Sequence, residues 1–488
     1  MLATTFGTVM SSFWPHMLFA FTTVVSAIAV VHAAMTKRDV RAAIAWVGVI
    51  LFSPLFGAVI YFVVGINRIR KQKVLAQLDN MLRFEEIRDR LLVTAVAPFS
   101  APQFAAQKKL GDTVNRFQLL GYNQISMILS GDEAYSRMIS VIEGAQRSIA
   151  VQSYIFDHDK VGIRIAQALI DAKGRGVEVR VLIDSVGSKY SRPTITKMLE
   201  QGGVKVALFM TTFFGLRLAY ANLRCHRKLM IIDGVHALTG GMNIRQEFSA
   251  TVMGVEAMQD THFDVRGPVV HQLMLSFAQD WSFTTGESLT GEPWFFSNEA
   301  LIPDQGVPVR CVPSAPDDMS LSSNHSILLG ALSAARHHVR IQSPYFLPDT
   351  QMLAALSTAA RRGVVVDIVV PGANNLKMVG AAMMAQLDQV LEPGCRVWRA
   401  SGTFDHSKLC AIDSAWSYIG SSNIDPRSLR LNFELDLEIF DQGLAKKIEE
   451  RIDSVIASAE PITLELIEGQ AFLTRLRNKI AWLFSPYL

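Results

Sequence analysis

CHRKLMIIDGVHALTGGMNI runs from Cys225 to Ile244, and DHSKLCAIDSAWSYIGSSNI runs from Asp405 to Ile424. Each stretch places a lysine two residues after a histidine and an aspartate five residues after the lysine. Each then reaches a Gly-Gly or Gly-Ser pair, one further residue and an asparagine. A single histidine before an apolar strand is usually structural, but two copies of the whole pattern indicate a duplicated unit.

The sequence around the two stretches repeats as well. Apolar runs alternate with segments of helical spacing, which predicts an α/β architecture. The first half has an expected strand, helix and strand at Arg147–Phe156, Ile165–Gly176 and Val177–Asp184. The second half has them at His338–Phe346, Met352–Gly363 and Val364–Pro371, after a proline-rich seam at Pro308–Asp318. Such a duplication can bring two equivalent sites together about a pseudo-twofold axis.

The histidine and the lysine of each stretch fall on one face of an extended segment, because side chains alternate along a strand. His226 and Lys228 can therefore act together. Asp233 points to the other face and begins a hairpin turn, with Val235–Thr239 as the return strand. The expected catalytic motifs are His226, Lys228 and Asp233, and His406, Lys408 and Asp413.

An imidazole beside an ammonium group suits a phosphodiester substrate. The imidazole can attack phosphorus while the lysine holds a phosphoryl oxygen as negative charge builds. Displacing an alkoxide also needs a proton donor, which the second histidine supplies before it accepts a proton from an incoming hydroxyl. This cycle needs neither a metal nor a nucleotide, so we expect no cofactor and no metal site.

Other polar residues are expected to support the two histidines. The glycine, serine and asparagine positions after each motif could cradle a phosphate: Gly241, Asn243, Ser421 and Asn423. A catalytic imidazole also needs a carboxylate or carbonyl to fix its tautomer. Glu434, which shares a strand face with Asp436 and Glu438, is the preferred partner. In the first half Asp260 or Asp264 could serve, and Asp260 is preferred.

The N-terminal segment is apolar in two long runs. Phe13–Ala34 and Ala42–Gly65 carry no formal charge and are long enough to cross a hydrocarbon core of about 30 Å. They predict a two-helix transmembrane hairpin in which Pro54 could kink the second helix. A buried helical pair is the alternative, and the absence of an early basic region argues against a cleaved signal peptide.

The charge of +3 is unevenly distributed. Seven basic residues and one acidic residue in the first 75 positions give +6, which leaves −3 for the remainder. That remainder is a poor partner for nucleic acid. The basic collar Arg68–Lys73 should attract anionic lipid and slightly favours a cytoplasmic C-terminal part. Four cysteines without a metal or disulfide spacing also fit a reducing compartment.

Two further segments carry a membrane signal. Thr211–Arg224 is apolar and precedes the first motif, and Ala471–Leu488 combines basic residues with leucine, isoleucine, tryptophan and phenylalanine. The second pattern is typical of an interfacial helix. A helix packed on the protein is the alternative for the C-terminal tail.

At these residues the chain resembles the phospholipase D superfamily, whose signature HxKxxxxDxxxxxxG(G/S)xN is met twice. From about residue 36 to 440 it is similar to bacterial cardiolipin synthases, including HRKLMIIDG, DTHFDVRGP, IQSPYF and GSSNIDPRSLRLNFE. One departure is Cys225, where these synthases commonly place asparagine before the histidine. The resemblance implies an α/β/α domain with pseudo-twofold symmetry after the hairpin.

The resemblance also implies an activity: transfer of a phosphatidyl group between two phosphatidylglycerol molecules to give cardiolipin and glycerol. His226 would be the nucleophile and His406 the acid and base, although the roles could be reversed. The expected partners are phosphatidylglycerol, other anionic phospholipids and the bacterial inner membrane, with a homo-oligomer left open. A phospholipase D hydrolase is the close alternative, and a membrane-anchored nuclease or a lipid-binding scaffold is less favoured.

The expected organisation has five parts. They are the hairpin and collar (1–75), a helical connector (76–124), the first half (125–305), the second half (306–460) and an amphipathic tail (461–488).

Overall fold

The computed structural model describes residues 2–37, 40–65, 91–210, 223–295, 303–315 and 323–485. The basic collar, most of Thr211–Arg224 and the end of the proline-rich seam lie outside these ranges. The chain divides into two compact units, one comprising Met1–Arg70 with Thr212–Asn222 and the other Lys71–Thr211 with Leu223–Leu488.

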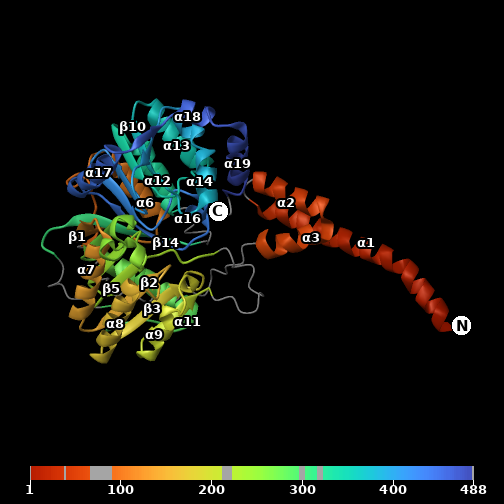
Figure 1. Ribbon diagram of the computed structural model, residues 1–488, viewed down its shortest axis with the longest axis horizontal. Coiled ribbons are helices and arrows are strands. Elements are labelled where there is room, and N and C mark those ends of the chain that lie inside the picture. Colours follow the sequence, from red (N-terminus) through yellow and green to blue (C-terminus); the bar gives the residue numbers. More distant parts are fainter. Residues whose placement is uncertain are drawn as a thin grey trace. The chain divides into compact units, whose positions relative to one another are not determined.

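The N-terminal unit contains the helices α1 (Leu2–Thr36), α2 (Val40–Phe52) and α3 (Pro54–Ile60), followed by one π-helical turn at Tyr61–Gly65 (Figure 1). Within the described residues, Phe13–Thr36 is the one helix that is long and apolar enough to cross a membrane. The second predicted span is divided at Ser53. Proline lacks a backbone N–H and its ring collides with the preceding helical turn, so α2 ends and a new helix starts at Pro54.

The two short helices fold back on each other beside α1. A Cβ atom on Gly57 of α3 would lie 2.3 Å from the carbonyl oxygen of Val49 in α2, so the two backbones are almost in contact. Ser26 of α1 donates a 2.8 Å hydrogen bond to the carbonyl of Pro54 at the turn. Thirteen residues of α2 extend about 20 Å, which is less than the hydrocarbon thickness of about 30 Å. The second predicted helix is therefore divided into two, each shorter than a membrane span, and the prediction of two spans is not confirmed.

The C-terminal unit is built on one sheet of fifteen strands. The strands of the first half are β1 (Leu120–Ile128), β2 (Ser148–Ser153), β3 (Glu178–Asp184), β4 (Lys205–Phe209), β5 (Leu229–Ile232), β6 (His236–Gly240) and β7 (His262–Arg266). Those of the second half are β8 (Val307–Ser314), β9 (His338–Gln342), β10 (Val365–Pro371), β11 (Arg396–Ala400), β12 (Leu409–Ile412), β13 (Trp416–Gly420) and β14 (Glu434–Ile439). A last strand, β15 (Glu460–Ile462), adds to the outer edge.

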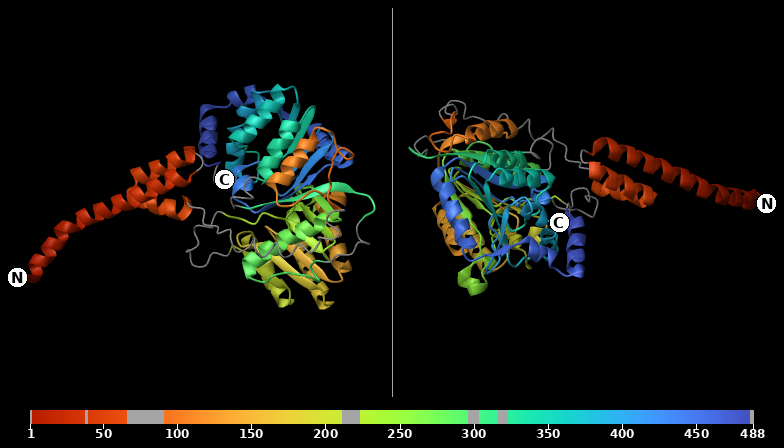
Figure 2. Two further views of the ribbon diagram at one scale, coloured as in Figure 1. Left: turned by 180° about the vertical axis from the view of Figure 1, so that it is seen from behind. Right: turned by 90° about the horizontal axis from the view of Figure 1, so that it is seen from above.

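The two halves have the same topology. Outward from the centre, the first half reads β1, β7, β6, β5, β2, β3, β4, and the second reads β8, β14, β13, β12, β9, β10, β11. The central strands β1 and β8 pair antiparallel and join the halves. Gln152 pairs with Leu229, and Gln342 pairs with Leu409, so the predicted correspondence of the halves holds in the register. The halves lie side by side, yellow to green and cyan to blue (Figures 1 and 2).

Helices cover both faces of the sheet. One layer in the first half consists of α7 (Gly131–Gly144), α8 (Lys160–Gly174) and α9 (Ile195–Gln201), and its counterpart consists of α12 (Ser323–Ala334), α13 (Thr350–Arg361), α14 (Lys377–Met384) and α15 (Asp388–Leu391). The other face carries α11 (Val269–Thr285) and α17 (Gln442–Ile456), whose side chains share one core across both halves. This arrangement confirms the duplicated α/β/α fold.

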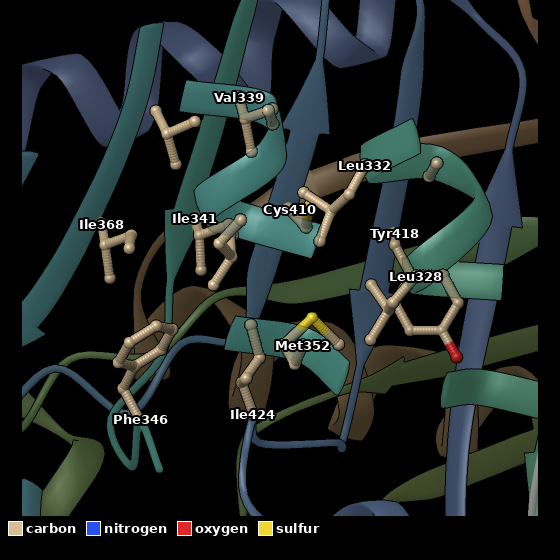
Figure 3. Packing of buried hydrophobic residues seen from close by; sticks show 14 of the residues in the cluster. Leu328, Leu332, Val339, Ile341, Phe346, Met352, Ile368, Cys410, Tyr418 and Ile424 are labelled. Carbon is tan, nitrogen blue, oxygen red and sulfur yellow. The ribbon is translucent and has the colours of Figure 1, made fainter. Parts of the chain in front are cut away.

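The outer core of the second half shows how strand alternation fills the layers. Leu328 and Leu332 of α12 and Met352 of α13 pack over strands β9, β10, β12 and β13 (Figure 3). Cys410 lies in this core, whereas its neighbours Leu409 and Ala411 face the shared central core. The expected period of two therefore holds in β12, and the Cys410 thiol serves as apolar filler.

The predicted connector is part of the globular unit. Its helix α6 (Phe104–Val114) packs on the second half, where the rings of Phe104 and Trp416 stack. Gln107 donates a 2.9 Å hydrogen bond to Glu438, and Gln103 donates a 3.0 Å bond to Asp413. The described part of this segment is therefore fixed to the fold that carries the second motif.

Candidate active site

The first histidine is held by the second half of the chain. The backbone N–H of His226 donates to the carbonyl of Phe433 at 2.9 Å. Its Nδ1 lies 2.9 Å from Oε2 of Glu434, which is completely buried at the start of β14. Glu434 also accepts hydrogen bonds from Ser421 and Asn432. This network fixes the orientation of the His226 ring.

The second histidine repeats the arrangement in the opposite direction. The backbone N–H of His406 donates to the carbonyl of Gln259 at 2.8 Å, and its Nδ1 lies 2.9 Å from Oδ2 of Asp260. Asp264, the other first-half candidate, instead pairs with His236 at 2.7 Å. Each imidazole is thus oriented by a carboxylate from the other half, which ties the two motifs into one structure.

Each motif lysine contacts the backbone of the histidine in its own motif. Nζ of Lys228 donates to the carbonyl of His226 at 2.6 Å, and Nζ of Lys408 donates to the carbonyl of His406 at the same distance. Burial lowers the pKa of Lys228 to about 7 and that of Lys408 to about 8. A bound phosphate would stabilise the charged form of both ammonium groups.

The histidine and carboxylate pairs are buried together. Burial, followed by the nearby lysine charges, lowers the pKa of His226 and of His406 well below the usual range. Burial raises the pKa of Glu434, and it raises that of Asp260 to about 7. A neutral imidazole that donates Nδ1–H to its carboxylate keeps the lone pair on Nε2. The resting site therefore offers the lone pair on Nε2 of His226, whereas Nε2 of His406 lies 3.1 Å from Nζ of Lys408.

The two motif aspartates do not belong to this network. Asp233 accepts hydrogen bonds from the backbone N–H groups of Gln146, Arg147 and Ser148. Asp413 accepts equivalent bonds from residues 336–338, the segment that leads into β9. Both aspartates have positive φ angles near 54° at the hairpin turns. Each aspartate therefore joins its hairpin turn to the segment that leads into the neighbouring strand, β2 or β9. The prediction that they stabilise the turns agrees with these contacts, and neither aspartate contacts a motif histidine.

The four predicted phosphate-binding residues divide into two groups. Asn243 and Asn423 line the cavity next to the histidines. Gly241 and Ser421 contact the carboxylates instead: a Cβ on Gly241 would lie 2.5 Å from Oδ1 of Asp260, and Ser421 donates a 2.6 Å hydrogen bond to Glu434. The structure therefore brings one pair to the cavity wall and the other pair behind the imidazoles.

Both histidines open into one cavity of about 320 Å³. Around His406 the wall is aromatic, with the rings of Phe248, Tyr345 and Phe404 centred about 6 Å from the imidazole. The described wall also contains three arginines, Arg224, Arg245 and Arg427. Its volume is at the lower end of ligand pockets, which suits a headgroup with the acyl chains outside.

Several of these wall residues were not foreseen from the sequence. When the motifs are aligned at their histidines, Arg224 corresponds to Phe404 and Arg245 corresponds to Asp425. The two halves therefore share the reactive groups but differ in the residues just outside them. That comparison within one sequence would have identified Arg224 and Phe404 as positions where the pseudo-symmetry is broken.

One group of carboxylates among the described residues is close enough to share a cation: Asp157, Asp159 and Glu247. Arg245 already forms ion pairs with Asp157 and Glu247. Asp159 accepts hydrogen bonds from the backbone at the start of α8. The Arg245 guanidinium and the backbone N–H groups therefore already neutralise and hydrogen-bond the carboxylates that a metal ion would need as ligands.

A duplicated α/β/α fold with two histidine and lysine motifs at one cavity defines a site for phosphodiester chemistry. The family described as cardiolipin synthase, PLD-like domain, matches residues 138–281 and 328–456, and a phospholipase D-nuclease N-terminal family matches residues 24–65. Cardiolipin synthase A of Pseudomonas fluorescens Pf-5 is 31% identical over 98% of this chain and 100% of its own length. That of Pseudomonas entomophila L48 is also 31% identical, over 94% of this chain and 96% of its own.

Solved structures agree on the fold. Phosphatidylserine synthase from Haemophilus influenzae superposes with a TM-score of 0.61 at 17% identity, covering 78% of this chain and all of that one. Polyphosphate kinase from Porphyromonas gingivalis gives a TM-score of 0.50 at 15% identity over 73% of this chain and 50% of its own. The chain belongs to the cardiolipin synthase family of phospholipase D-like proteins, and the expected enzyme class, a phosphatidyltransferase, is confirmed.

Proposed function

We propose that this protein joins two phosphatidylglycerol molecules into cardiolipin and glycerol through a phosphohistidine intermediate. The observation that carries the proposal is the crossed arrangement of the site. His226 is oriented by Glu434, His406 is oriented by Asp260, and both rings open into the same cavity. Two equivalent imidazoles at one phosphorus atom are what a double displacement requires.

The contacts of the two rings support different roles. Nε2 of His406 lies 3.1 Å from the ammonium group of Lys408. Among the described residues, no donor is found within hydrogen-bond distance of Nε2 of His226, so its lone pair is available to the cavity. We assign His226 as the nucleophile and His406, beside a proton source, as the acid and base.

In the first step, Nε2 of His226 attacks the phosphorus atom of phosphatidylglycerol. The bond from phosphorus to the glycerol headgroup oxygen breaks, and His406 in its protonated form gives that oxygen its proton, so neutral glycerol leaves. The substrate phosphodiester favours this protonated form, because an anion beside an imidazole raises its pKa. Lys228 and Lys408 stabilise the charge on the equatorial oxygens.

In the second step, a headgroup hydroxyl of another phosphatidylglycerol enters the cavity. His406, now neutral, takes its proton as the oxygen attacks phosphorus, and the bond to His226 breaks. One phosphodiester is exchanged for another, so the cycle needs no external energy source. Water in place of the lipid hydroxyl would give phosphatidic acid by the same route.

The N-terminal helix α1 is consistent with a membrane-bound enzyme, and we propose one span with a cytoplasmic C-terminal unit. Lys37, at the end of α1, donates a hydrogen bond to the carbonyl of Gly65, so both ends of the α2–α3 hairpin lie together. The turn at Pro54 lies beside Ser26, ten residues or about 15 Å along α1 from Thr36. With one span, all seven basic residues before position 75 fall on the same side, as the positive-inside rule favours.

The function is tested with the full chain reconstituted in phosphatidylglycerol vesicles containing EDTA. We expect equal amounts of cardiolipin and glycerol, and a phosphatidyl adduct on His226 when the reaction is quenched in acid and digested. His226→Ala and His406→Ala should each lower turnover by about a thousandfold or more. Phosphatidic acid as the main product would identify a hydrolase instead. Turnover that survives replacement of both histidines would exclude the mechanism.

A further inference from the structure

We propose that α19 (Phe472–Leu483) docks on the surface of an anionic lipid bilayer and holds the rim of the active-site cavity at the headgroup level. The helix belongs to the C-terminal unit and lies along α14 (Figure 1). The docking surface is defined here as the exposed apolar side chains of residues 472–484. The binding of α19 to the bilayer does not depend on the proposed reaction. The effect of this binding on turnover rests on the proposed function.

The helix has two opposite faces of different character. Thr474, Asn478, Ala481 and Trp482 face the protein, and Ala481 is buried in the outer core of the second half. At about 100° per residue, these four positions fall within a sector of about 100°. The opposite sector carries Phe472 (76% exposed), Leu473 (76%), Leu476 (44%), Ile480 (49%), Leu483 (68%) and Phe484 (52%). Six large apolar side chains on one outward face are more than scattered surface residues require.

The basic residues of α19 fall on the borders between these faces. Arg475 and Lys479 lie on one border and Arg477 lies on the other, about 70° to 110° from the centre of the buried face. The described helix contains no acidic residue. An apolar face flanked by cations fits the boundary between acyl chains and anionic headgroups, where each group finds its preferred environment. That charge pattern favours lipid over an apolar protein partner.

The docking surface is connected to the cavity through α14. The helix α19 packs on α14, and the segment Leu376–Met384 provides Leu376 and Val379 to the cavity wall. Leu376 and Met378 are themselves about half exposed. Apolar surface therefore continues from α19 to the rim of the cavity. A lipid substrate could enter from the bilayer without carrying its acyl chains through water.

Docking is tested by placing a fluorescent probe on the full-length protein in vesicles. Leu476→Cys and Ile480→Cys, each labelled with an environment-sensitive dye, report on the apolar face, and Glu450→Cys on the exposed face of α17 is the matched control. The four native cysteines are buried, so background labelling should be low. In phosphatidylglycerol vesicles we expect blue-shifted emission and at least threefold stronger quenching by headgroup-labelled lipid at positions 476 and 480 than at 450.

Two results would overturn the proposal. Equal quenching at positions 476, 480 and 450 would show that the face remains in water. A blue shift without lipid quenching would show that protein, either a second copy or another part of this chain, covers the face.

The functional consequence is tested with the triple variant Leu473→Gln, Leu476→Gln, Ile480→Gln. These side chains are exposed, so the melting temperature should not change. Turnover of long-chain phosphatidylglycerol in vesicles should fall about fivefold or more, while turnover of a water-soluble short-chain analogue stays the same. Unchanged turnover of both substrates would contradict the role in presenting lipid. If the wild-type protein turned over neither substrate, the proposed function would fail and the probe experiment would still decide the docking.

Discussion

At the scale of single residues, the two halves orient their histidines with matched but different pairs. Gly241 leaves room for the short carboxylate of Asp260, whereas Ser421 donates a hydrogen bond to the longer Glu434. The size of the residue at this position is thus coupled to the length of the acidic side chain opposite. A serine at position 241 would collide with Asp260, whereas a glycine at position 421 would remove a hydrogen bond to Glu434.

Gly241→Ser tests this coupling. Its Cβ would lie 2.5 Å from Asp260 Oδ1 and would push the carboxylate away from His406, so we expect kcat to fall about a hundredfold. The matched change, Ser421→Gly, removes one hydrogen bond and leaves space, so about a tenfold loss is expected. Equal kcat values for the Gly241→Ser variant and the wild-type protein, with melting temperatures recorded alongside, would show that Asp260 does not need its observed position.

The buried lysines predict the pH dependence. A lysine is charged below its pKa, and burial places that of Lys228 at about 7 and that of Lys408 at about 8. We therefore expect kcat/KM, which reports on the free enzyme, to fall as pH rises through about 7 to 8. Lys228→Arg keeps its charge at these pH values and should move the descending limb upward, although its planar head should lower the maximum. If the descending limb of the kcat/KM profile stays at the same pH in this variant and in Lys408→Arg, groups other than these lysines cause the decline.

Arg224 is the residue that breaks the symmetry most directly. It lines the cavity two positions before His226, and among the described residues its guanidinium donates only to the carbonyl of Leu223. It can therefore bind the phosphate of an anionic lipid. Arg224→Gln should raise KM for phosphatidylglycerol about tenfold with a smaller change in kcat, and Arg224→Lys should recover part of the loss. A fall in kcat at constant KM, measured in vesicles, would argue against a binding role.

The sequence predicted which residues lie together at the site better than it predicted their connections. His226, His406 and their lysines were evident because the motifs are local. The preference for Asp260 over Asp264 agrees with the observed contact at His406. That each carboxylate serves the histidine of the opposite half was not predictable, because it depends on pairing between segments about 150 to 200 residues apart.

At the scale of elements, the same long-range pairing explains the short motif strands. The first motif was expected to be extended from the histidine onward, but β5 begins at Leu229. The backbone of Cys225 and His226 pairs with Phe433 instead of β2, and Asp405 pairs likewise with Gln259. Because of these bridges, the backbone at each histidine pairs with the opposite half and not with the sheet of its own half.

The divided second apolar stretch has a local cause that the sequence already contained. Pro54 was expected to kink a spanning helix, but with Ser53 it ends α2, and the chain folds back. The window of apolar residues was long enough for a span, so length and hydropathy could not distinguish a continuous helix from a re-entrant hairpin. Gly57, which permits close packing against Val49, is the residue that makes the hairpin compact.

A topology with one span predicts which positions share a side of the membrane. Thr36→Cys at the end of α1 and Glu450→Cys on α17 should both react with an impermeant maleimide only after the inner membrane is opened. With two continuous spans, Thr36 and Glu450 would lie on opposite sides, and Thr36→Cys alone would react in intact cells. The protein with its four buried native cysteines is the control for background labelling.

At the scale of the whole molecule, the crossed contacts make each half incomplete. Residues of the first half orient the second histidine and residues of the second half orient the first, while β1 and β8 join the two parts of the sheet. Duplication has therefore produced one site from two copies, without leaving two independent sites. In the proposed mechanism, the asymmetric wall around that site allows one imidazole to attack while the other transfers protons.

This organisation predicts the outcome of mixing two inactive proteins. His226→Ala and His406→Ala chains, reconstituted together in the same phosphatidylglycerol vesicles, should remain as inactive as either chain alone, because both rings must come from one polypeptide. The result should hold whether or not the chains associate, since the site lies within a single copy. The control is wild-type protein diluted to the same total density with the double variant. If cardiolipin formation recovers in the mixture, the two histidines can act from different molecules, and the single-chain site described here is not the catalytic unit.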